Sequence, residues 1–272
     1  MCRYDQFISN NQVASKNQVI TNKWHNEVSW NKVVIVTGGS RGIGAATSRL
    51  LASKGYAVCV NFIHNESRAE ELVNDIREQG GTAISVRADV SVESDVKSLF
   101  EIARNKLGPV THLVNNAGIL FTQSPLVDIE LDRFEKVMKS NVSSCFLCSK
   151  AFIKQADGAG SIVNVSSAAS RTGAPFEYVD YAASKGAMDS LTKGLSLELA
   201  SRNIRVNGVR PGCIYTEMHA DGGEPDRVDR LASQLPLQRG GTPEEVANSI
   251  AWLLSDEASY VTGSFIDIAG GR

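Results

Sequence analysis

Short apolar runs alternate with longer amphipathic segments from residue 32 to the end of the chain. A short apolar run bounded by turn residues is typical of a buried strand, whereas apolar positions that recur about every three or four residues are typical of a helix. These patterns predict strands at 32–37, 56–62, 82–88, 112–115, 161–166, 204–209 and 264–268. They predict helices at 42–54, 67–79, 92–107, 180–201 and 243–255, and one or two more within 130–156.

Strands separated by helices of this length form βαβ units, in which the strands run parallel and the helices cover both faces of the sheet. The predicted fold class is therefore α/β, with a doubly wound parallel sheet of about seven strands. A single domain over residues 32–272 is expected, because no linker or low-complexity tract divides it. Residues 1–31 are rich in Asn, Gln and Ser and are expected to form a disordered polar extension.

Charge and cysteine content limit the function classes. The 272 residues include 28 Lys and Arg against 30 Asp and Glu, a formal net charge of −2 at pH 7. Such a balance argues against nucleic acid or an acidic membrane as a partner. The apolar runs are far shorter than the ~20 residues of a membrane-spanning helix. Five scattered cysteines favour a reducing, cytoplasmic setting, and the Cys145 and Cys148 pair is expected to pack inside a helix rather than to bind a metal.

A glycine-rich turn, Thr37-Gly38-Gly39-Ser40-Arg41-Gly42-Ile43-Gly44, joins the first predicted strand to its helix. Backbone N–H groups and the positive end of the helix dipole favour a diphosphate at such a turn. Side chains at the glycine positions would block the approach of a cofactor, or of the helix to its strand. The alternative is a loop with incidental glycines, and the strand before and helix after the turn argue against it. The candidate cofactor contacts here are Gly38, Ser40, Arg41, Gly42, Ile43 and Gly44.

The spacing of these glycines, with Thr37 in front, resembles that of the short-chain dehydrogenase/reductase family. Further segments resemble the family in the same order, namely Asn115-Asn116-Ala117-Gly118, Asn141-Val142, Ser166-Ser167, Tyr181-Ala182-Ala183-Ser184-Lys185 and Pro211-Gly212-Cys213-Ile214-Tyr215-Thr216. The resemblance covers about residues 32–271. It implies a Rossmann fold, an oxidoreductase acting on CH–OH and C=O groups, and a homotetramer.

The candidate catalytic residues are Ser167, Tyr181, Lys185 and Asn141. Tyr181 and Lys185 lie four positions apart on a predicted helix, so both project from one face. A phenol with a pKa near ~10 needs a neighbouring cation to work at neutral pH, and Lys185 is expected to lower its pKa. The resemblance implies that Tyr181 exchanges a proton with the substrate oxygen, Ser167 orients that oxygen, Lys185 also holds the nicotinamide ribose, and Asn141 anchors a water. A Tyr and a Lys on the wet face of a helix are the alternative.

The cofactor is predicted to be NADP(H), with NAD(H) as the alternative. The second strand ends Val60-Asn61-Phe62-Ile63-His64, without the carboxylate that favours NAD. Arg41 offers a planar guanidinium to a 2′-phosphate, unless it is only a solvated turn residue, and Asn61 and His64 are expected to donate beside it. The resemblance implies further cofactor contacts from Asp89, Val90, Asn116, Ala117, Gly118, Tyr181, Lys185, Pro211, Gly212, Ile214 and Thr216. Asn116 has a second interpretation, the stabilisation of the central sheet.

Several substrate classes fit the sequence. Tyr181 follows Ser167 by 14 positions, one more than is usual in the family, so an inserted residue is expected in the loop 168–180 beside the substrate pocket. The polar segment 217–234 resembles the family's mobile lid. Polar candidates for the pocket are His219, Arg171 and Glu177, and apolar candidates are Phe121, Tyr178 and Leu231.

A small-molecule carbonyl or secondary alcohol is the expected substrate. Sugar dehydrogenation of the glucose type and reduction of a carrier-bound 3-oxoacyl group are the alternatives. A non-catalytic NADP(H)-binding sensor belongs to a different function class, since a fold does not dictate activity. The presence of both Tyr181 and Lys185 argues against the sensor.

Overall fold

Seven parallel strands form one sheet in the computed structural model, which describes residues 32–272. The predicted extension at 1–31 lies outside the described residues. The strands are β1 (Val33–Val36), β2 (Ala57–Phe62), β3 (Thr82–Arg87), β4 (His112–Asn115), β5 (Gly160–Val165), β6 (Ile204–Pro211) and β7 (Phe265–Ile268). Their order is β3-β2-β1-β4-β5-β6-β7, so the chain reverses direction across the sheet between β1 and β4. The carboxyl ends of these two strands therefore border the crevice in which doubly wound folds bind ligands.

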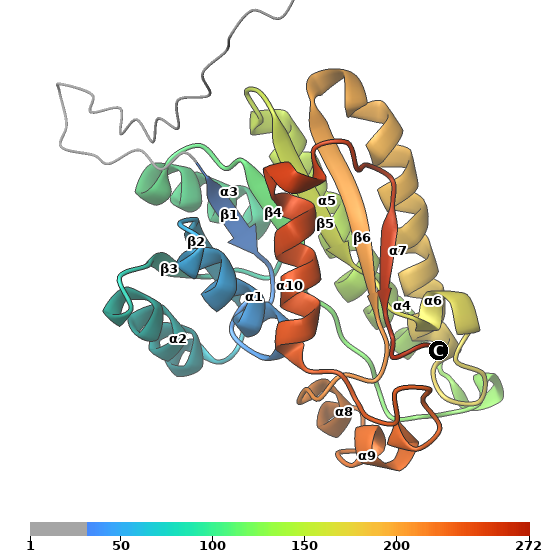
Figure 1. Ribbon diagram of the computed structural model, residues 1–272. Coiled ribbons are helices and arrows are strands. Elements are labelled where there is room, and N and C mark those ends of the chain that lie inside the picture. The colour runs from blue at the N-terminus through green and yellow to red at the C-terminus, as the bar shows by residue number, and fades with distance from the viewer. Residues whose placement is uncertain (1–31) are drawn as a thin grey trace, which may run out of the picture.

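Two layers of helices enclose the sheet, as Figure 1 shows. The long helices are α1 (Gly42–Ser53), α2 (Glu66–Glu78), α3 (Glu93–Leu107), α4 (Leu131–Met138), α5 (Ser144–Gln155), α7 (Val179–Glu198) and α10 (Pro243–Leu254). The sequence-predicted fold class, a Rossmann fold with helices on both faces, is confirmed. None of the helices in the described part of the chain combines the length and apolar content needed to cross a membrane.

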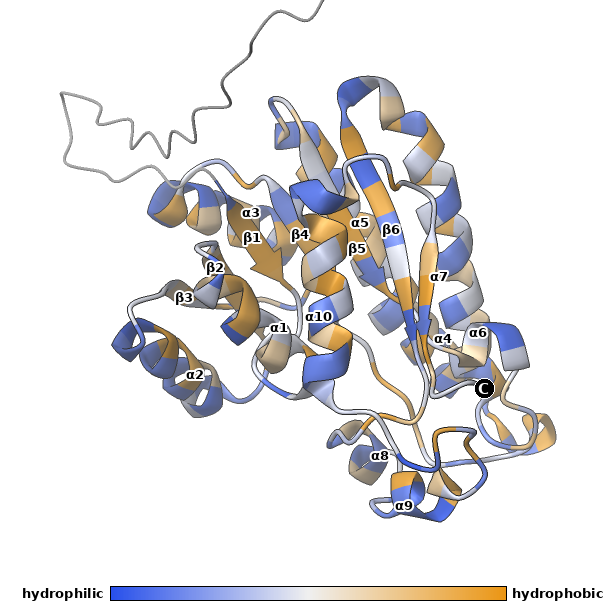
Figure 2. Cartoon of the chain, viewed as in Figure 1, coloured by the Kyte–Doolittle hydropathy of each residue, from blue (hydrophilic) through white to orange (hydrophobic). Residues whose placement is uncertain are grey.

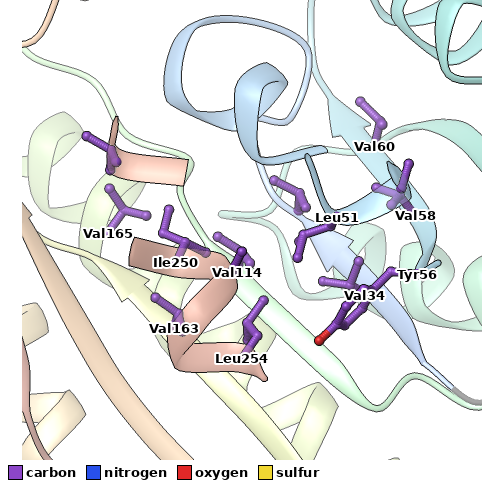
Figure 3. Packing of buried hydrophobic residues seen from close by; sticks show 14 of the residues in the cluster. Val34, Leu51, Tyr56, Val58, Val60, Val114, Val163, Val165, Ile250 and Leu254 are labelled. Carbon is purple, nitrogen blue, oxygen red and sulfur yellow. The ribbon is translucent and has the colours of Figure 1, made fainter. Parts of the chain in front are cut away.

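Alternate residues of β1 belong to different hydrophobic cores, because side chains of a strand point to opposite faces. Val34 lies in the cluster that includes Leu51 of α1 and Ile250 of α10, and Figure 3 shows part of this packing. Ile35 lies in the other cluster, with residues of α3, α5 and the end of α7. All four residues of β1 are buried, and Figure 2 colours the strand as hydrophobic along its length. Burial on both faces explains the continuous apolar run of the first predicted strand.

The segment 130–156 contains two helices joined without a break by a π-helical turn, η2 (Lys139–Ser143). This turn carries Asn141, which is fully buried. Cys145 and Cys148 on α5 are also buried, in agreement with the expected packing inside a helix. Single π turns are frequent at functional sites, and this one contains a candidate site residue.

Several short elements have no counterpart in the prediction. They are the helices α6 (Ala169–Thr172), α8 (Met218–Asp221) and α9 (Arg227–Ala232), and the 3₁₀ turns η1 (Leu126–Asp128), η3 (Ala200–Arg202) and η4 (Asp256–Ala258). The long helix predicted at 180–201 ends at Glu198 and is followed by η3. Asn203, with a φ of 55°, then turns the chain into β6. The helices α8 and α9 lie together below the end of β6 in Figure 1.

Candidate active site

Ser167, Tyr181 and Lys185 line one cavity of about 240 Å³. Ser167 follows the carboxyl end of β5, while Tyr181 and Lys185 lie on α7. The Ser167 hydroxyl oxygen accepts a hydrogen bond of 3.1 Å from the backbone N–H of Ala169, which holds it at the start of α6. The sequence therefore identified three side chains that the fold brings to the same cavity.

Burial raises the pKa of the Tyr181 phenol to about 12, although a hydrogen bond with Ser167 acts in the opposite direction. The expectation that Lys185 lowers this pKa is not met. The Lys185 ammonium lies 5.5 Å from the centre of the Tyr181 ring and donates to the carbonyl oxygen of Val165 at 2.7 Å. The pKa of the phenol is therefore set mainly by its removal from water and not by the nearby cation.

Lys185 is itself buried, and desolvation lowers its pKa to about 8. Its ammonium also lies 3.5 Å from the Met188 sulfur. Burial disfavours the charged form of a lysine, so the site holds this cation at a cost in folding stability.

Asn141 does not line the first cavity. Its side-chain oxygen accepts from the backbone N–H of Ile119 at 2.8 Å. Its amide nitrogen donates to the carbonyl oxygen of Ile119 and to the Ser184 hydroxyl, each at 3.0 Å. Asn141 therefore ties η2 to α7 and to the segment after β4. The predicted role of Asn141 in anchoring a water stays a prediction.

A second cavity of about 470 Å³ follows the carboxyl ends of β1, β2 and β4. Of the predicted cofactor residues, it is lined by Gly38, Ser40, Arg41, Gly42, Ile43, His64, Asp89, Val90, Asn116, Ala117, Gly118 and Thr216. Pro211, Gly212, Ile214, Tyr181 and Lys185 line the first cavity instead. Ile43, Asn116, Thr216 and Met218 line both. The two cavities are therefore adjacent.

Two glycines of the turn are needed for different reasons. Gly38 has a φ of 59°, a left-handed conformation that a side chain strains. A Cβ at Gly44 would lie 2.7 Å from the Asn116 amide nitrogen and closer still to the Gly38 carbonyl oxygen. Gly44 lines neither cavity and instead lets α1 approach the turn. Asn116 donates to the carbonyl oxygens of Thr37 and Gly38, so it stabilises the centre of the sheet as well as lining the cavity.

Asn61 departs from its predicted place. Its exposed fraction is 1%, and it lines neither cavity. Its side-chain oxygen accepts from the backbone N–H of Gly38 at 3.2 Å, and its amide donates to the carbonyl oxygen of Ala88 at 3.0 Å. Because its polar atoms are used within the protein, Asn61 holds the glycine turn against β3 and is not placed for the predicted donation to a phosphate. Asp89 also has an internal contact, since one carboxylate oxygen accepts from the N–H and the hydroxyl of Ser91.

Arg68 was not among the predicted cofactor residues. This residue lies in the first turn of α2 and lines the second cavity together with Arg41 and His64. Both arginines form ion pairs with acidic residues after β6. Arg41 pairs with Asp221 at 2.5 Å, and Arg68 pairs with Glu217. The position of Arg68 in the first turn of the helix that follows β2 was the available signal.

The substrate end of the first cavity is mixed in polarity. Glu177, Tyr178 and His219 line it, as predicted, but Leu231 does not. Arg171 pairs with Asp267 on β7, and Phe121 packs against the small hydrophobic cluster that includes Tyr178. Arg227 was missed, although it is 6% exposed and lines the cavity. It donates to Glu177 at 2.6 Å and to Glu224 at 2.9 Å.

The loop 168–180, in which an inserted residue is expected, contains two strained positions beside this pocket. Ala174 and Phe176 have φ values of 43° and 63°, which residues other than glycine rarely adopt. Ala174 and Pro175 line the cavity. Such outliers cluster at ligand sites, and here they lie in a loop that helps to shape the pocket.

A glycine turn at the switch point of a doubly wound sheet is the arrangement of a dinucleotide-binding protein. A family model described as enoyl-(acyl carrier protein) reductase matches residues 38–272. The chain belongs to the short-chain dehydrogenase/reductase family, as its motifs predicted.

Similar proteins cover almost all of the described residues. An uncharacterized oxidoreductase, YgfF of Escherichia coli (strain K12), is 56% identical over 88% of this chain and 99% of its own length. Glucose 1-dehydrogenase 2 of Bacillus subtilis (strain 168) is 35% identical over 88% of this chain and 94% of its own. The crystal structure of a short-chain dehydrogenase from Burkholderia cenocepacia J2315 in complex with NADP is 32% identical, with a TM-score of 0.82, and covers 88% of this chain and 97% of its own.

Proposed function

We propose that this chain transfers a hydride between NADP(H) and a small carbonyl or secondary-alcohol substrate. The main support is the position of Tyr181, which lines the first cavity together with Ser167 and Lys185. This cavity is adjacent to the second cavity, the crevice beside the glycine turn. NADP(H), when bound, supplies or accepts the hydride. The residues of the chain supply the proton and the orientation of the reacting oxygen.

The crevice fits a 2′-phosphorylated dinucleotide. The backbone of the glycine turn and the start of α1 suit the diphosphate. Arg41 and Arg68 suit the 2′-phosphate, and no residue from 60 to 65 is acidic. The solved relative in complex with NADP supports the same choice. We therefore propose NADP(H) as the preferred cofactor, with NAD(H) as the poorer one.

The proton is proposed to pass between the phenol oxygen of Tyr181 and the substrate oxygen. With its pKa raised to about 12, the phenol is protonated at neutral pH. It therefore carries the proton that a carbonyl oxygen would take up during reduction. Ser167 would hydrogen-bond the same oxygen, and the buried Lys185 ammonium would stabilise negative charge that develops at the phenol. Asn141 would keep η2 and α7 in register through Ser184.

A sugar or polyol is a specific second candidate for the substrate. Glu177, His219 and Arg227 place hydrogen-bonding groups at the cavity, and one relative is a glucose 1-dehydrogenase. The hydroxyl groups of a polyol would find more hydrogen-bonding partners among these groups than an alkyl ketone would.

The Tyr181→Phe variant tests the proposal. We expect about a 10²-fold to 10⁴-fold loss of carbonyl reduction, the usual contribution of a general acid. NADPH affinity, measured by fluorescence titration, should stay within about twofold, because only the phenol oxygen is removed. Tyr260→Phe is the matched control, since Tyr260 is fully exposed. A Tyr181→Phe variant that reduces carbonyls at the parent rate contradicts the proposed mechanism. A parent protein that binds NADPH but turns over no ketone, sugar or 3-oxoacyl ester supports the sensor instead.

We also propose a homotetramer. Leu131 and Phe134 on α4 and Phe146 on α5 are exposed apolar side chains, which are typical of subunit interfaces. Sedimentation at micromolar concentration tests this, and a monomer would contradict it.

A further inference from the structure

Four charged side chains from three segments that are distant in the sequence line the second cavity, the crevice in which the cofactor is proposed to bind. Arg41 belongs to the glycine turn and Arg68 to α2, whereas Glu217 and Asp221 belong to the segment that precedes and forms α8. They form two ion pairs, Arg41 with Asp221 and Arg68 with Glu217. Residues 68 and 217 are 149 positions apart in the sequence. The two pairs connect the segment 217–234, which resembles the family's lid and is called the lid segment below, to the glycine turn and to α2.

The two arginines have the chemistry of a phosphate site. Each guanidinium presents a planar set of N–H donors that matches phosphate or carboxylate oxygens. In this structure the carboxylates of Glu217 and Asp221 accept from these donors. A 2′-phosphate on an adenosine bound in the crevice would seek the same donors, and Glu217 and Asp221 would repel it.

The ion pairs are weak enough to be exchanged. The side chains of Arg41 and Asp221 are 44% and 49% exposed, and those of Arg68 and Glu217 are 44% and 41% exposed. Half-exposed pairs of this kind contribute little to stability, because water screens them. A single phosphate dianion can accept charge-assisted hydrogen bonds from both guanidinium groups at once.

We propose that Glu217 and Asp221 act as a latch that a 2′-phosphate releases. The two carboxylates hold Arg41 and Arg68 and so fasten α8 across the crevice. A 2′-phosphorylated adenosine takes over both arginines, frees α8, and thereby couples recognition of the 2′-phosphate to movement of the lid above the substrate cavity. Met218, between the two acids, lines both cavities, so the released segment borders the catalytic site. The latch rests on the proposed NADP(H) preference but not on turnover.

Binding of two small probes tests the latch. Adenosine 2′,5′-bisphosphate and adenosine 5′-monophosphate differ only in the 2′-phosphate, and calorimetry with the full chain gives the affinity for each. In the double variant Glu217→Gln, Asp221→Asn, we expect the bisphosphate to bind about threefold to tenfold more tightly, because two weak competing pairs are gone. In Arg68→Gln we expect about tenfold weaker binding of the bisphosphate. The monophosphate affinity should not change in either variant.

Matched controls separate the latch from a general change of charge. Asp226→Asn removes an acid of the lid segment that does not line the crevice, and Arg104→Gln removes an exposed arginine on α3. Neither control should change the affinity for the bisphosphate. An unchanged or weaker affinity in the double acid variant overturns the latch.

Hydrogen exchange provides the readout for movement. The backbone N–H groups of Asp221 and Gly222 donate to the carbonyl oxygens of Glu217 and Met218 and so close the single turn of α8. The bisphosphate, but not the monophosphate, should speed exchange of these two N–H groups in the parent protein, and slower or equal exchange overturns the latch. A parent that does not prefer the bisphosphate to the monophosphate refutes the NADP(H) preference as well. A parent with that preference, but with no effect of the acid variants, refutes the latch alone.

Discussion

Replacement of the buried Lys185 by methionine should stabilise the folded chain at neutral pH while removing its activity. Burial lowers the pKa of Lys185 from its ordinary 10.5 to about 8. The folded state therefore binds the proton less tightly than the unfolded state does, and stability is lost as the pH falls from about 10.5 toward about 8. The difference in pKa corresponds to a cost of about 3 kcal/mol at pH 7. Lys185→Met removes this cost, and it also removes the bond to the Val165 carbonyl, worth about 1–2 kcal/mol.

Urea unfolding at two pH values separates the two effects. At pH 7 the variant should be more stable than the parent by about 1–2 kcal/mol. At pH 10 about 1 kcal/mol of the charge cost remains, so the variant should lose its advantage and become slightly less stable. Lys193→Met on the same helix is the control, because Lys193 is exposed. A difference between parent and Lys185→Met that is the same at pH 7 and pH 10 refutes the reasoning.

Three further substitutions test the local structure around the site. Gly44→Ala should weaken NADPH binding at least about tenfold in fluorescence titration while circular dichroism stays unchanged, because the added Cβ pushes α1 off the turn. Arg133→Met should cost about 3–5 kcal/mol in urea unfolding, because it leaves the Asp180 carboxylate, 1% exposed, without its 2.8 Å partner. Thr242→Ala should cost about 1 kcal/mol in the same assay, because it removes the capping box at the start of α10. A cost below about 0.5 kcal/mol for Arg133→Met would show that Asp180 finds another partner.

Most of the fold was predictable because each long element carries its own pattern. β1 reads as one apolar run since both of its faces are buried, and α10 is preceded by Thr242 and begins at Pro243, both start signals for a helix. The missed elements, such as α6 and α8, have four residues each. Segments this short show no complete helical period, so their conformation depends on contacts with the rest of the chain.

The site was predictable where one backbone segment sets the geometry. Tyr181 and Lys185 share a helix face, and the glycines of the turn share one loop, so spacing alone brings their backbones together. Asn61 shows the limit of this reasoning. Its position at the end of β2 was correct, but the choice between cavity and interior was decided by the carbonyl oxygen of Ala88 beyond the end of β3 and by the N–H of Gly38 in the turn. Neither partner is visible in the local pattern.

The prediction that Lys185 lowers the pKa of Tyr181 was wrong for the same reason. Helical spacing places the Lys185 backbone one turn from Tyr181, but it does not say which acceptor the ammonium reaches. In the folded chain the carbonyl oxygen of Val165, at the end of β5, lies 2.7 Å from that ammonium. Burial is the largest cause acting on the phenol, so its pKa is raised in spite of the lysine on the same helix face. The electrostatics of the pair therefore follow from the packing of α7 on β5, a contact between segments that no spacing within α7 encodes.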